Sequence, residues 1–524
     1  MYKKMLTEWI RKLQPRQSRR LTEEHLNAAM ILMEIELEEV RKELEKLYSQ
    51  DKRGRKGYDP VCVLRALLLM IILQYERISK FAEELYDKPR LAMIAGFKPK
   101  KTPAASTFYL FIDRLEDGEH QKSCEHKLKA SKKRKKKHIR NLSAEKESKE
   151  ARKKQIEKES DSITIHLKKE LLAKKQEPRV KGLQKLLEDL LMKLAIIPSA
   201  NKGLLGELTK LKVCGDGSAL ESGANCNGQP TCDCRSKGIY KCKCDRIYSD
   251  PTADWGFDSY RQIYYFGHTF YQHTISVSGH DLPLHITMGP ASESDFTLSM
   301  KSLDSMLKMF SAHVLPVNIY SMSYDSGHDG LGIYQYLKAN SIKPVIALNP
   351  RSGTLPKPTG TAKLVNEKGV PLCPAGLEMR CNGKRGDGRI YYNCPVKRPT
   401  HLNGKYLFKT HSQECPQGSL CQPDSQMGPV VYIRSSDDLR LYPDISRYSP
   451  EYKLLMNLRT GCERSNSTKK VVHKLANRPC RSASHFLVRL YLVAILEHSK
   501  AWLAERKKIV GSDTLKLIAS FLAA

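Results

Sequence analysis

Residues 261–291, RQIYYFGHTFYQHTISVSGHDLPLHITMGPA, indicate the fold class. Two runs rich in aromatic and β-branched residues flank a turn at Gly279–Pro283, which predicts a pair of antiparallel strands. Four other segments extend the pattern, and they read in order as a strand, a helix, a strand and a strand: 211–216 (LKVCGD), 294–313, 317–327 (VNIYSMSYDSG) and 343–350. A helix is also expected at 330–342, between the last two strands. Antiparallel strands followed by alternating helix and strand predict an α/β sheet.

Helical segments come before these strands. Residues 21–50 read as one helix with Thr22 or Ser18 as its possible cap, and a second helix is expected to begin at Pro60. Shorter helices follow, the last with Ser106 as its expected N-cap. The pattern fits a helix-turn-helix-like DNA reader or a plain helical bundle, and it leaves both open.

Changes in composition divide the chain into five parts. Residues 351–435 are rich in Gly, Pro and Cys and break the α/β rhythm, so they read as an insertion of loops and strands. The expected parts are a helical N-terminal region, a basic helical linker, a first part of the α/β region, the Cys-rich insertion, and a C-terminal part of the α/β region: 1–120, 121–200, 201–350, 351–435 and 436–524.

The charge of the chain favours a polyanionic partner. The 524 residues include 89 Lys and Arg against 57 Asp and Glu, a net charge of +32. Residues 121–160 alone carry 16 basic and 6 acidic residues, a net of 16 − 6 = +10. Such an excess suits phosphates, whose neutralisation releases counterions. The longest apolar run, Ala66–Leu73, is too short to cross a bilayer, so we expect no membrane partner and a cytoplasmic location.

Two aspartates end predicted strands. Asp216 and Asp325 each follow an apolar run and precede small residues. Ligands gather at the carboxyl ends of strands in α/β sheets, and carboxylates there can approach a hard cation such as Mg²⁺. The alternative is that both are ordinary loop residues that cap turns.

A third acidic residue lies on a late helix. Arg459, Glu463 and Lys470 are spaced i, i+4 and i+11, which places them on one helical face. The glutamate can then bind a metal while the two cations bind phosphates beside it. Alternatively, Arg459 and Glu463 form a plain surface salt bridge.

The ordered set of these segments resembles the DDE transposases of insertion sequences, which have a ribonuclease-H-like core. Their glutamate motif is often Tyr-x2-Arg-x3-Glu-x6-Lys; Arg459, Glu463 and Lys470 match it, whereas Met456 occupies the tyrosine position and Tyr452 lies one turn earlier. Matching stretches extend from about residue 58 to 502 and include YDPVCVLRALLLMIILQYE (58–76), DPTADWGFDSYRQIYYFGHTF (250–270) and CERSNSTKK (462–470).

This resemblance implies cleavage at the ends of an insertion sequence and strand transfer into target DNA. Asp216, Asp325 and Glu463 would hold two Mg²⁺ or Mn²⁺ ions about 4 Å apart for in-line displacement at phosphorus. DNA phosphates would contact Arg459, Lys470, Arg464 and Asn466. The resemblance also implies a homodimer on DNA in a bacterial nucleoid. Two alternatives are a non-enzymatic zinc-containing DNA-binding protein and a metal-dependent nuclease without strand transfer.

Ten of the fifteen cysteines fall into two clusters. The first has two Cys-x-Cys pairs, Cys232 with Cys234 and Cys242 with Cys244, preceded by Cys226. The second is spread through the insertion, at Cys373, Cys381, Cys394, Cys415 and Cys421. Dense thiols in a reducing compartment favour structural zinc over disulfides, although the spacing is not that of a Cys-x2-Cys ribbon and free thiols are the alternative.

Overall fold

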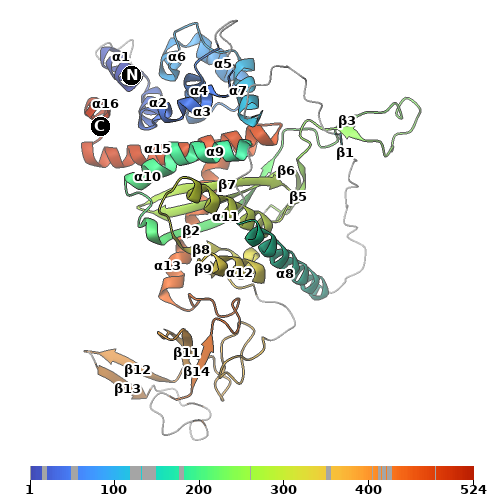
Figure 1. The fold of residues 1–524 in the computed structure, drawn as a ribbon, viewed down its shortest axis with the longest axis vertical. Coiled ribbons are helices and arrows are strands. Elements are labelled where there is room, and N and C mark those ends of the chain that lie inside the picture. The colour runs from blue at the N-terminus through green and yellow to red at the C-terminus, as the bar shows by residue number, and fades with distance from the viewer. Residues whose placement is uncertain are drawn as a thin grey trace.

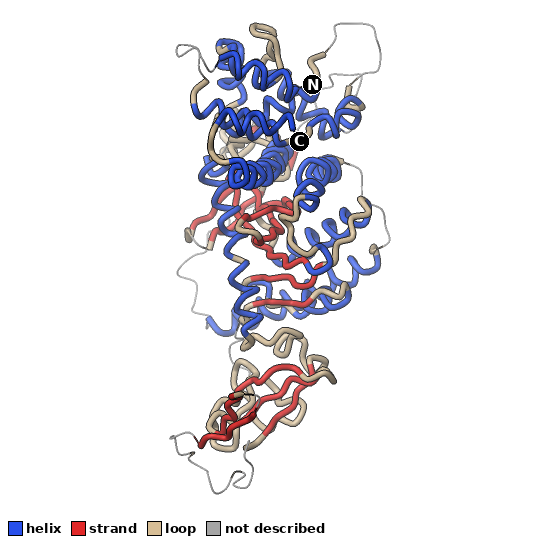
Figure 2. The backbone as a smooth tube through the Cα atoms, turned by 90° about the vertical axis from the view of Figure 1, so that its left-hand side faces the viewer, coloured by secondary structure: helices blue, strands red, loops and turns tan. Residues whose placement is uncertain are grey.

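The computed structural model shows a mixed α/β protein with a helical N-terminal region (Figures 1 and 2). It describes residues 2–13, 21–48, 57–117, 131–132, 149–175, 182–259, 261–349, 356–403, 405–410, 415, 421, 428–477 and 479–523. Within these ranges no helix is long and apolar enough to cross a membrane.

A mixed sheet forms the centre of the molecule. Its main strands lie side by side in the order β7, β6, β2, β8 and β9, with the short strand β5 paired to β6. β6 is antiparallel to both β7 and β2, whereas β8 runs parallel to β2, and β9 runs parallel to β8. The bounds are β2 Leu211–Glu221, β5 Asp254–Asp258, β6 Ile263–Val277, β7 His280–Pro290, β8 Ile319–Tyr324 and β9 Lys343–Ile346. The predicted α/β sheet is thereby confirmed.

The β6–β7 hairpin has a tighter turn than predicted. Val277 pairs with His280, so the turn is Ser278–Gly279 and not the longer Gly279–Pro283. Both turn residues have positive φ, 58° and 78°, as a two-residue hairpin turn with the right twist requires. Pro283 lies inside β7, opposite Thr274, where the register shifts.

Helices cover both faces of the sheet. Along β6, His273 hydrogen-bonds Ser302 of α11 (Asp295–Ala312), whereas Gln272 and Thr274 contact residues of α14 (Thr460–Ser467). Neighbouring side chains of a strand point to opposite faces, so α11 and α14 lie on opposite sides of the sheet. The face of α11 also carries α12 (Leu331–Ala339) and α8 (Lys149–Ala173), which pack against each other.

The N-terminal region is built from short helices: α1 Tyr2–Leu13, α2 Glu23–Glu34, the 3₁₀ turn Leu37–Val40, α3 Arg41–Glu45, α4 Pro60–Ile72, α5 Ile78–Asp87, α6 Pro89–Ala95 and α7 Ala105–Asp117. Thr22 caps α2, and α4 begins at Pro60, as predicted. The single helix expected over 21–50 is wrong, because Ile35 adopts an extended conformation that ends α2. Ser106 is not an N-cap either, since α7 already begins at Ala105.

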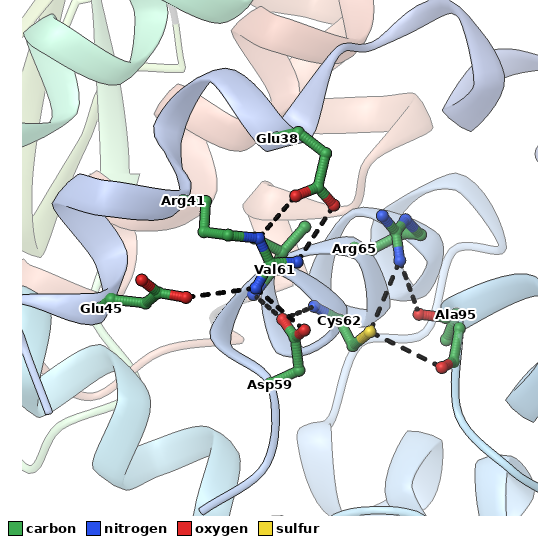
Figure 3. Close-up of polar contacts among 9 residues, drawn as sticks. Glu38, Arg41, Glu45, Asp59, Val61, Cys62, Arg65 and Ala95 are labelled. Carbon is green, nitrogen blue, oxygen red and sulfur yellow. Dashed lines mark hydrogen bonds and ion pairs between the residues drawn. The ribbon is translucent and has the colours of Figure 1, made fainter. Parts of the chain in front are cut away.

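Polar contacts fix the start of α4 (Figure 3). Asp59 accepts hydrogen bonds from the backbone amides of Val61 and Cys62 at 2.8 and 3.3 Å, and its other oxygen lies 3.0 Å from Arg41. Arg41 also pairs with Glu38, 2.5 Å away. One aspartate thus caps α4 and joins it to α3.

The helix α15 (Ala483–Val510) connects the N-terminal helices to the sheet (Figure 1). Toward the N-terminal helices, Arg489 donates to the carbonyls of Tyr75 and Glu76, and Ser499 donates to that of Ile31. On its sheet side, Tyr491 donates to the carbonyl of Ile286 in β7. The leucine-rich helix α9 (Leu183–Leu191) packs beside α15.

Two parts lie at the margins of this body. Residues 356–449 contain the insertion, whose strands β10 Arg380–Lys384, β11 Arg389–Asn393 and β14 Val430–Arg434 form a sheet over a small core of their own. β12 Lys397–Leu402 and β13 Lys405–Thr410 form a separate hairpin. Of the expected linker, 149–173 is α8, while the most basic stretch, 133–140, lies outside the described residues.

Candidate active site

The strand register brings Asp216 and Asp325 together. β2 and β8 run parallel, and their last paired residues are Cys214 and Ser323. Asp216 and Asp325 each lie two residues further along, so they are neighbours at the end of β8. The prediction that Asp216 follows its strand is wrong, because pairing with the longer β6 continues β2 as far as Glu221.

The two aspartates have opposite pKa shifts. Burial and the charge of Asp325 raise the pKa of Asp216 to about 6, against the opposing effect of Arg459. Burial would also raise the pKa of Asp325, but the hydrogen bond and charge of His328 outweigh it and lower that pKa. The protein therefore stabilises the ionised form of Asp325, whereas Asp216 lacks sufficient positive charge nearby to stabilise its ionised form.

His328 and Tyr271 form a hydrogen-bonded chain that ends on Asp325. The Nδ1 atom of His328 lies 2.5 Å from the Asp325 carboxylate, and its Nε2 atom lies 3.0 Å from the Tyr271 hydroxyl. Burial and nearby Tyr324 raise the pKa of Tyr271 well above its usual value, so this hydroxyl stays protonated. An ionised carboxylate can only accept, so the Nδ1 atom of His328 carries a proton and donates it to the hydrogen bond with Asp325. Neither residue was predicted from the sequence.

Asp295 adds a fourth carboxyl group near the pair. It is the first residue of α11, after the N-cap Ser294. A Cβ atom built on Gly217 would lie 2.6 Å from the Asp295 carboxylate, so the glycine next to Asp216 makes room for it. Burial raises the pKa of Asp295, and the charge of Asp325 adds to this shift.

Glu463 reaches the site on a helix that packs very closely on the sheet. α13 (Pro450–Leu458) leads into α14, and a π-helical turn, Thr468–Val472, follows. A Cβ atom at Gly461 would lie 1.7 Å from Ser276 Oγ of β6 and 2.3 Å from the Asp281 carboxylate of β7. Only glycine permits this approach of α14 to the β6–β7 hairpin.

Arg459 stands among the three carboxylates. Its guanidinium nitrogens lie 2.7 Å from Glu463 and 3.9 Å from Asp216. Burial would lower the pKa of Arg459, but the charges of Glu463, Asp216 and Asp325 together raise it. The ion pair of Arg459 and Glu463 is thus present, and the charges of Asp216 and Asp325 act on the same guanidinium.

Two other predicted residues face the same site. The side-chain amide of Asn466 donates to Asp216 at 3.0 Å, and Lys470 donates to Ser218 at 3.1 Å. Asp216 and Ser218 share one face of β2 because they are two residues apart. Arg464 instead makes two hydrogen bonds of 2.8 Å with Asp281, on the outer side of the hairpin.

A buried ion pair holds α14 and the π-helical turn after it against α15. Lys469, with none of its side chain exposed, lies 2.5 Å from Glu497, and Ser465 bonds to both residues. Gln272 of β6 also donates to Ser465. Lys469 and Glu497 are far apart in the sequence, so no spacing pattern predicted this ion pair.

The first cysteine cluster assembles into one group. The sulfurs of Cys232, Cys234, Cys242 and Cys244 all lie within 4.8 Å of one another, so they could hold a metal ion. Cys226 is not part of this group. In the second cluster, burial and the neighbouring thiols Cys394, Cys415 and Cys373 raise the pKa of Cys421, whereas Cys381 contacts Ser446 at 3.3 Å.

Comparison with known families gives one match. Residues 15–114 match the family model described as Transposase domain (DUF772), and this range contains the helices α2 to α6 and most of α7. No curated protein matches the chain. The N-terminal region is similar to a transposase domain, which supports the identification of the chain as a transposase.

Proposed function

We propose that the protein is a DDE transposase, which cleaves the ends of an insertion sequence and joins them to target DNA. The observation that carries the proposal is the convergence of Asp216, Asp325 and Glu463 on the guanidinium of Arg459. These residues come from two strands and a helix that are distant in sequence, and the Arg-x3-Glu-x6-Lys pattern resembles that of the family.

The sheet topology supports the same proposal. Numbered along the chain, the strands β2, β6, β7, β8 and β9 lie in the order three, two, one, four, five. The first three are antiparallel, and the last two run parallel to the first. This arrangement resembles a ribonuclease-H-like core, with the segment 351–435 as an insertion before the glutamate helix. The helical region 1–120 would then be the DNA-binding domain.

The residues present fit divalent cations. Three carboxylates supply hard oxygen ligands, which Mg²⁺ and Mn²⁺ prefer. The amide oxygen of Asn466 is buried beside Asp216 and accepts no hydrogen bond from any described residue. Asp216, Asp325 and Glu463 would hold two ions. When bound, such ions activate a water or a DNA 3′-hydroxyl and stabilise the leaving oxygen.

The side chains around the carboxylates position the DNA. Arg459 carries a planar fork that can bind a phosphate through two hydrogen bonds once the carboxylates have other counter-ions. Lys470 donates to Ser218, two residues along β2 from Asp216, and burial and the charge of Arg261 lower its pKa. We assign these two cations to phosphates on either side of the scissile bond. The same role for Arg464 and Asn466 is a weaker part of the proposal, because Asp281 and Asp216 already hold their side chains.

DNA is the partner that this function requires, both as element ends and as target. The net charge of +32 suits it. A homodimer would pair the two ends of an element, and a bacterial nucleoid would be the place of action.

The test is an assay of cleavage and joining with DNA that carries the repeats flanking the coding sequence. In Mg²⁺ the wild-type protein should yield both cut and joined products. Asp216→Asn, Asp325→Asn and Glu463→Gln should each abolish both products while DNA binding persists, because the amide keeps the shape and removes the charge.

Glu451→Gln is the matched control. Glu451 is a carboxylate on α13 that bonds to Tyr320, away from the three carboxylates, so its variant should cut normally. Cut but unjoined products would favour a nuclease without strand transfer. Binding without any metal-dependent cutting would favour a non-enzymatic DNA-binding protein.

A further inference from the structure

A cysteine-bearing arm projects from the side of the molecule (Figure 1). Its stem is a small sheet in which β4 (Arg246–Ile247) pairs with β3 (Gln229–Pro230) on one side and with β1 (Ser131–Lys132) on the other. The segment 231–245 joins β3 to β4 and carries the four thiols. We call residues 229–247 the cysteine arm.

The cysteine arm has no hydrophobic core. The structure describes every residue from 223 to 247, and none of them is buried. Its strands β3 and β4 have two residues each. Isolated hairpins of this size are not stable in water, so apolar packing cannot account for the arm's shape.

The four thiols have the geometry of a tetrahedral metal site. The sulfur of Cys232 lies 3.6 Å from that of Cys242, and the sulfur of Cys234 lies 3.7 Å from that of Cys244. Four Zn–S bonds of about 2.3 Å in a tetrahedron separate the sulfurs by about 3.8 Å. Disulfide sulfurs would be about 2.05 Å apart. The thiol ligand set selects zinc over magnesium or calcium.

The surface of the arm is basic, with an aromatic tip. Residues 231–246 contain five Lys and Arg against two Asp, and Lys237 pairs with Asp233. Arg235, Lys241 and Lys243 form no ion pair with any described residue. Tyr240 at the tip has 73% of its side chain exposed, and neighbouring Ile239 has 52% exposed.

The arm also marks where the most basic stretch of the chain departs. Ser131 pairs with Ile247 and Lys132 with Arg246, and the sequence continues directly into KRKKKHIR at 133–140. A zinc ion with four thiolates carries a net charge of −2, so the five basic residues at 231–246 are needed for the arm to attract a polyanion.

We propose that Cys232, Cys234, Cys242 and Cys244 bind one structural Zn²⁺ ion, which shapes the cysteine arm into a contact for the DNA backbone. Zinc binding releases the thiol protons and supplies the folding energy that the arm lacks. The fixed arm then presents Arg235, Lys241 and Lys243 to phosphates and Tyr240 to a base or sugar. The zinc site is independent of the proposed function, while the DNA contact rests on it.

Metal analysis of the purified full-length protein tests the zinc site. Cys232→Ser and Cys244→Ser should each lose one equivalent of zinc per chain relative to wild type, while Cys226→Ser, a nearby cysteine outside the group, should keep it. Cobalt exchanged into the wild-type site should show the charge-transfer and d–d bands of tetrahedral thiolate coordination. Equal zinc in all four proteins, or two disulfides in place of free thiols, would overturn the assignment.

Binding to random-sequence duplex DNA at several salt concentrations tests the DNA-backbone role of the arm. The triple variant Arg235→Gln/Lys241→Gln/Lys243→Gln should keep its zinc, and its log–log salt slope should fall by about 0.9 for each phosphate that the variant no longer neutralises. The control Lys507→Gln/Lys508→Gln/Lys516→Gln removes equal charge from the C-terminal end of α15 and from residue 516 just beyond it. Equal slopes in both triple variants would overturn this role. Because this assay requires no cutting, an inactive transposase site would leave its outcome unchanged.

Discussion

The carboxylate site and the cysteine arm are two candidate metal sites with opposite relations to the fold. Asp216, Asp325 and Glu463 are held by a paired sheet and a helix packed tightly upon it. The four thiols of the arm lie in a segment without one buried residue. In the first site the scaffold positions the ligands before any ion binds, whereas in the second the ion itself is required to position them.

This difference determines what each site can do. A site held by the fold can keep like charges together, as the raised pKa of Asp216 shows, and this makes it suitable for chemistry. A site that the metal itself shapes gains stability when the metal binds, and it is suitable for structure. Removing the metal should therefore unfold the cysteine arm but leave the carboxylate site folded. Displacing the helix that carries Glu463 should instead impair the carboxylate site.

The largest effect is expected from Gly461→Ala. The added Cβ would clash with Ser276 and Asp281, so α14 must move and carry Glu463 with it. Overpacking of this kind costs about 1–3 kcal/mol of stability, and a displacement near 1 Å can cost about a hundredfold in rate. Cleavage kinetics and thermal unfolding measure both losses. Ser467→Ala, on the same helix, is the control, and normal cleavage by Gly461→Ala would show that α14 need not pack so closely.

Asp216→Asn should stabilise the metal-free protein. The folded-state pKa of Asp216 is about 6, above the usual 3.8, so its ionisation opposes folding. Its contribution to stability is present below about pH 4, is lost as the pH rises to about 6, and stays absent above. At pH 7.5 in chelator, the variant should gain up to about 3 kcal/mol.

Denaturant unfolding at pH 7.5 and pH 3.5 measures this gain. The two proteins should converge at the lower pH, and adding Mg²⁺ at pH 7.5 should stabilise the wild type more than the variant. Asp325→Asn should not show the gain, because His328 lowers the pKa of that group. A wild type that is more stable than Asp216→Asn in chelator would contradict the electrostatic description of the pair.

Arg459→Lys should reduce the rate of strand cleavage about tenfold or more, which corresponds to about 1.4 kcal/mol of transition-state stabilisation. Lysine keeps the charge beside Glu463 and Asp216 but loses the planar fork. Lys470→Ala should have a similar effect. If Arg459 and Glu463 form only a surface salt bridge, both variants should cut at the wild-type rate, because exposed pairs contribute little.

The smallest effect is expected in the core when zinc is removed from the arm. A thiol-competing chelator should expose residues 231–246 to trypsin at Arg235 and Lys241, while the main unfolding transition shifts by less than about 0.5 kcal/mol. Mass spectrometry of the fragments and calorimetry measure the two responses. A large shift of the main transition would show that the arm supports the core.

The sequence predicted the sheet well because its strands carry strong local signals. The runs at 261–291 and 317–327 appear as β6, β7 and β8, and helix starts at Thr22 and Pro60 follow capping rules. The prediction of a single helix over 21–50 was wrong, because the backbone is extended at Ile35 and the Ile35 side chain is buried there. Such packing between distant segments leaves no signal in the local sequence.

The sequence predicted the acidic residues of the candidate site but not the residues that hold them in place. Asp216, Asp325 and Glu463 stood out by spacing and by resemblance, whereas His328, Tyr271, Lys469 and Glu497 act through contacts between distant segments. Asp216 was placed past its strand because the apolar run ends there. Pairing with β6 continues the strand to Glu221, through a segment in which Ala219 and Leu220 are the apolar residues.

The most direct test of the three carboxylates is cleavage of an element end whose leaving 3′ oxygen is replaced by sulfur. Mg²⁺ binds sulfur poorly and Mn²⁺ accepts it. If the carboxylates hold ions at the leaving group, the wild type should lose cleavage of this DNA in Mg²⁺ and regain it in Mn²⁺, while Asp216→Asn, Asp325→Asn and Glu463→Gln stay inactive in both. Equal cleavage in the two metals, or restored cleavage in any of these variants, would contradict the assignment.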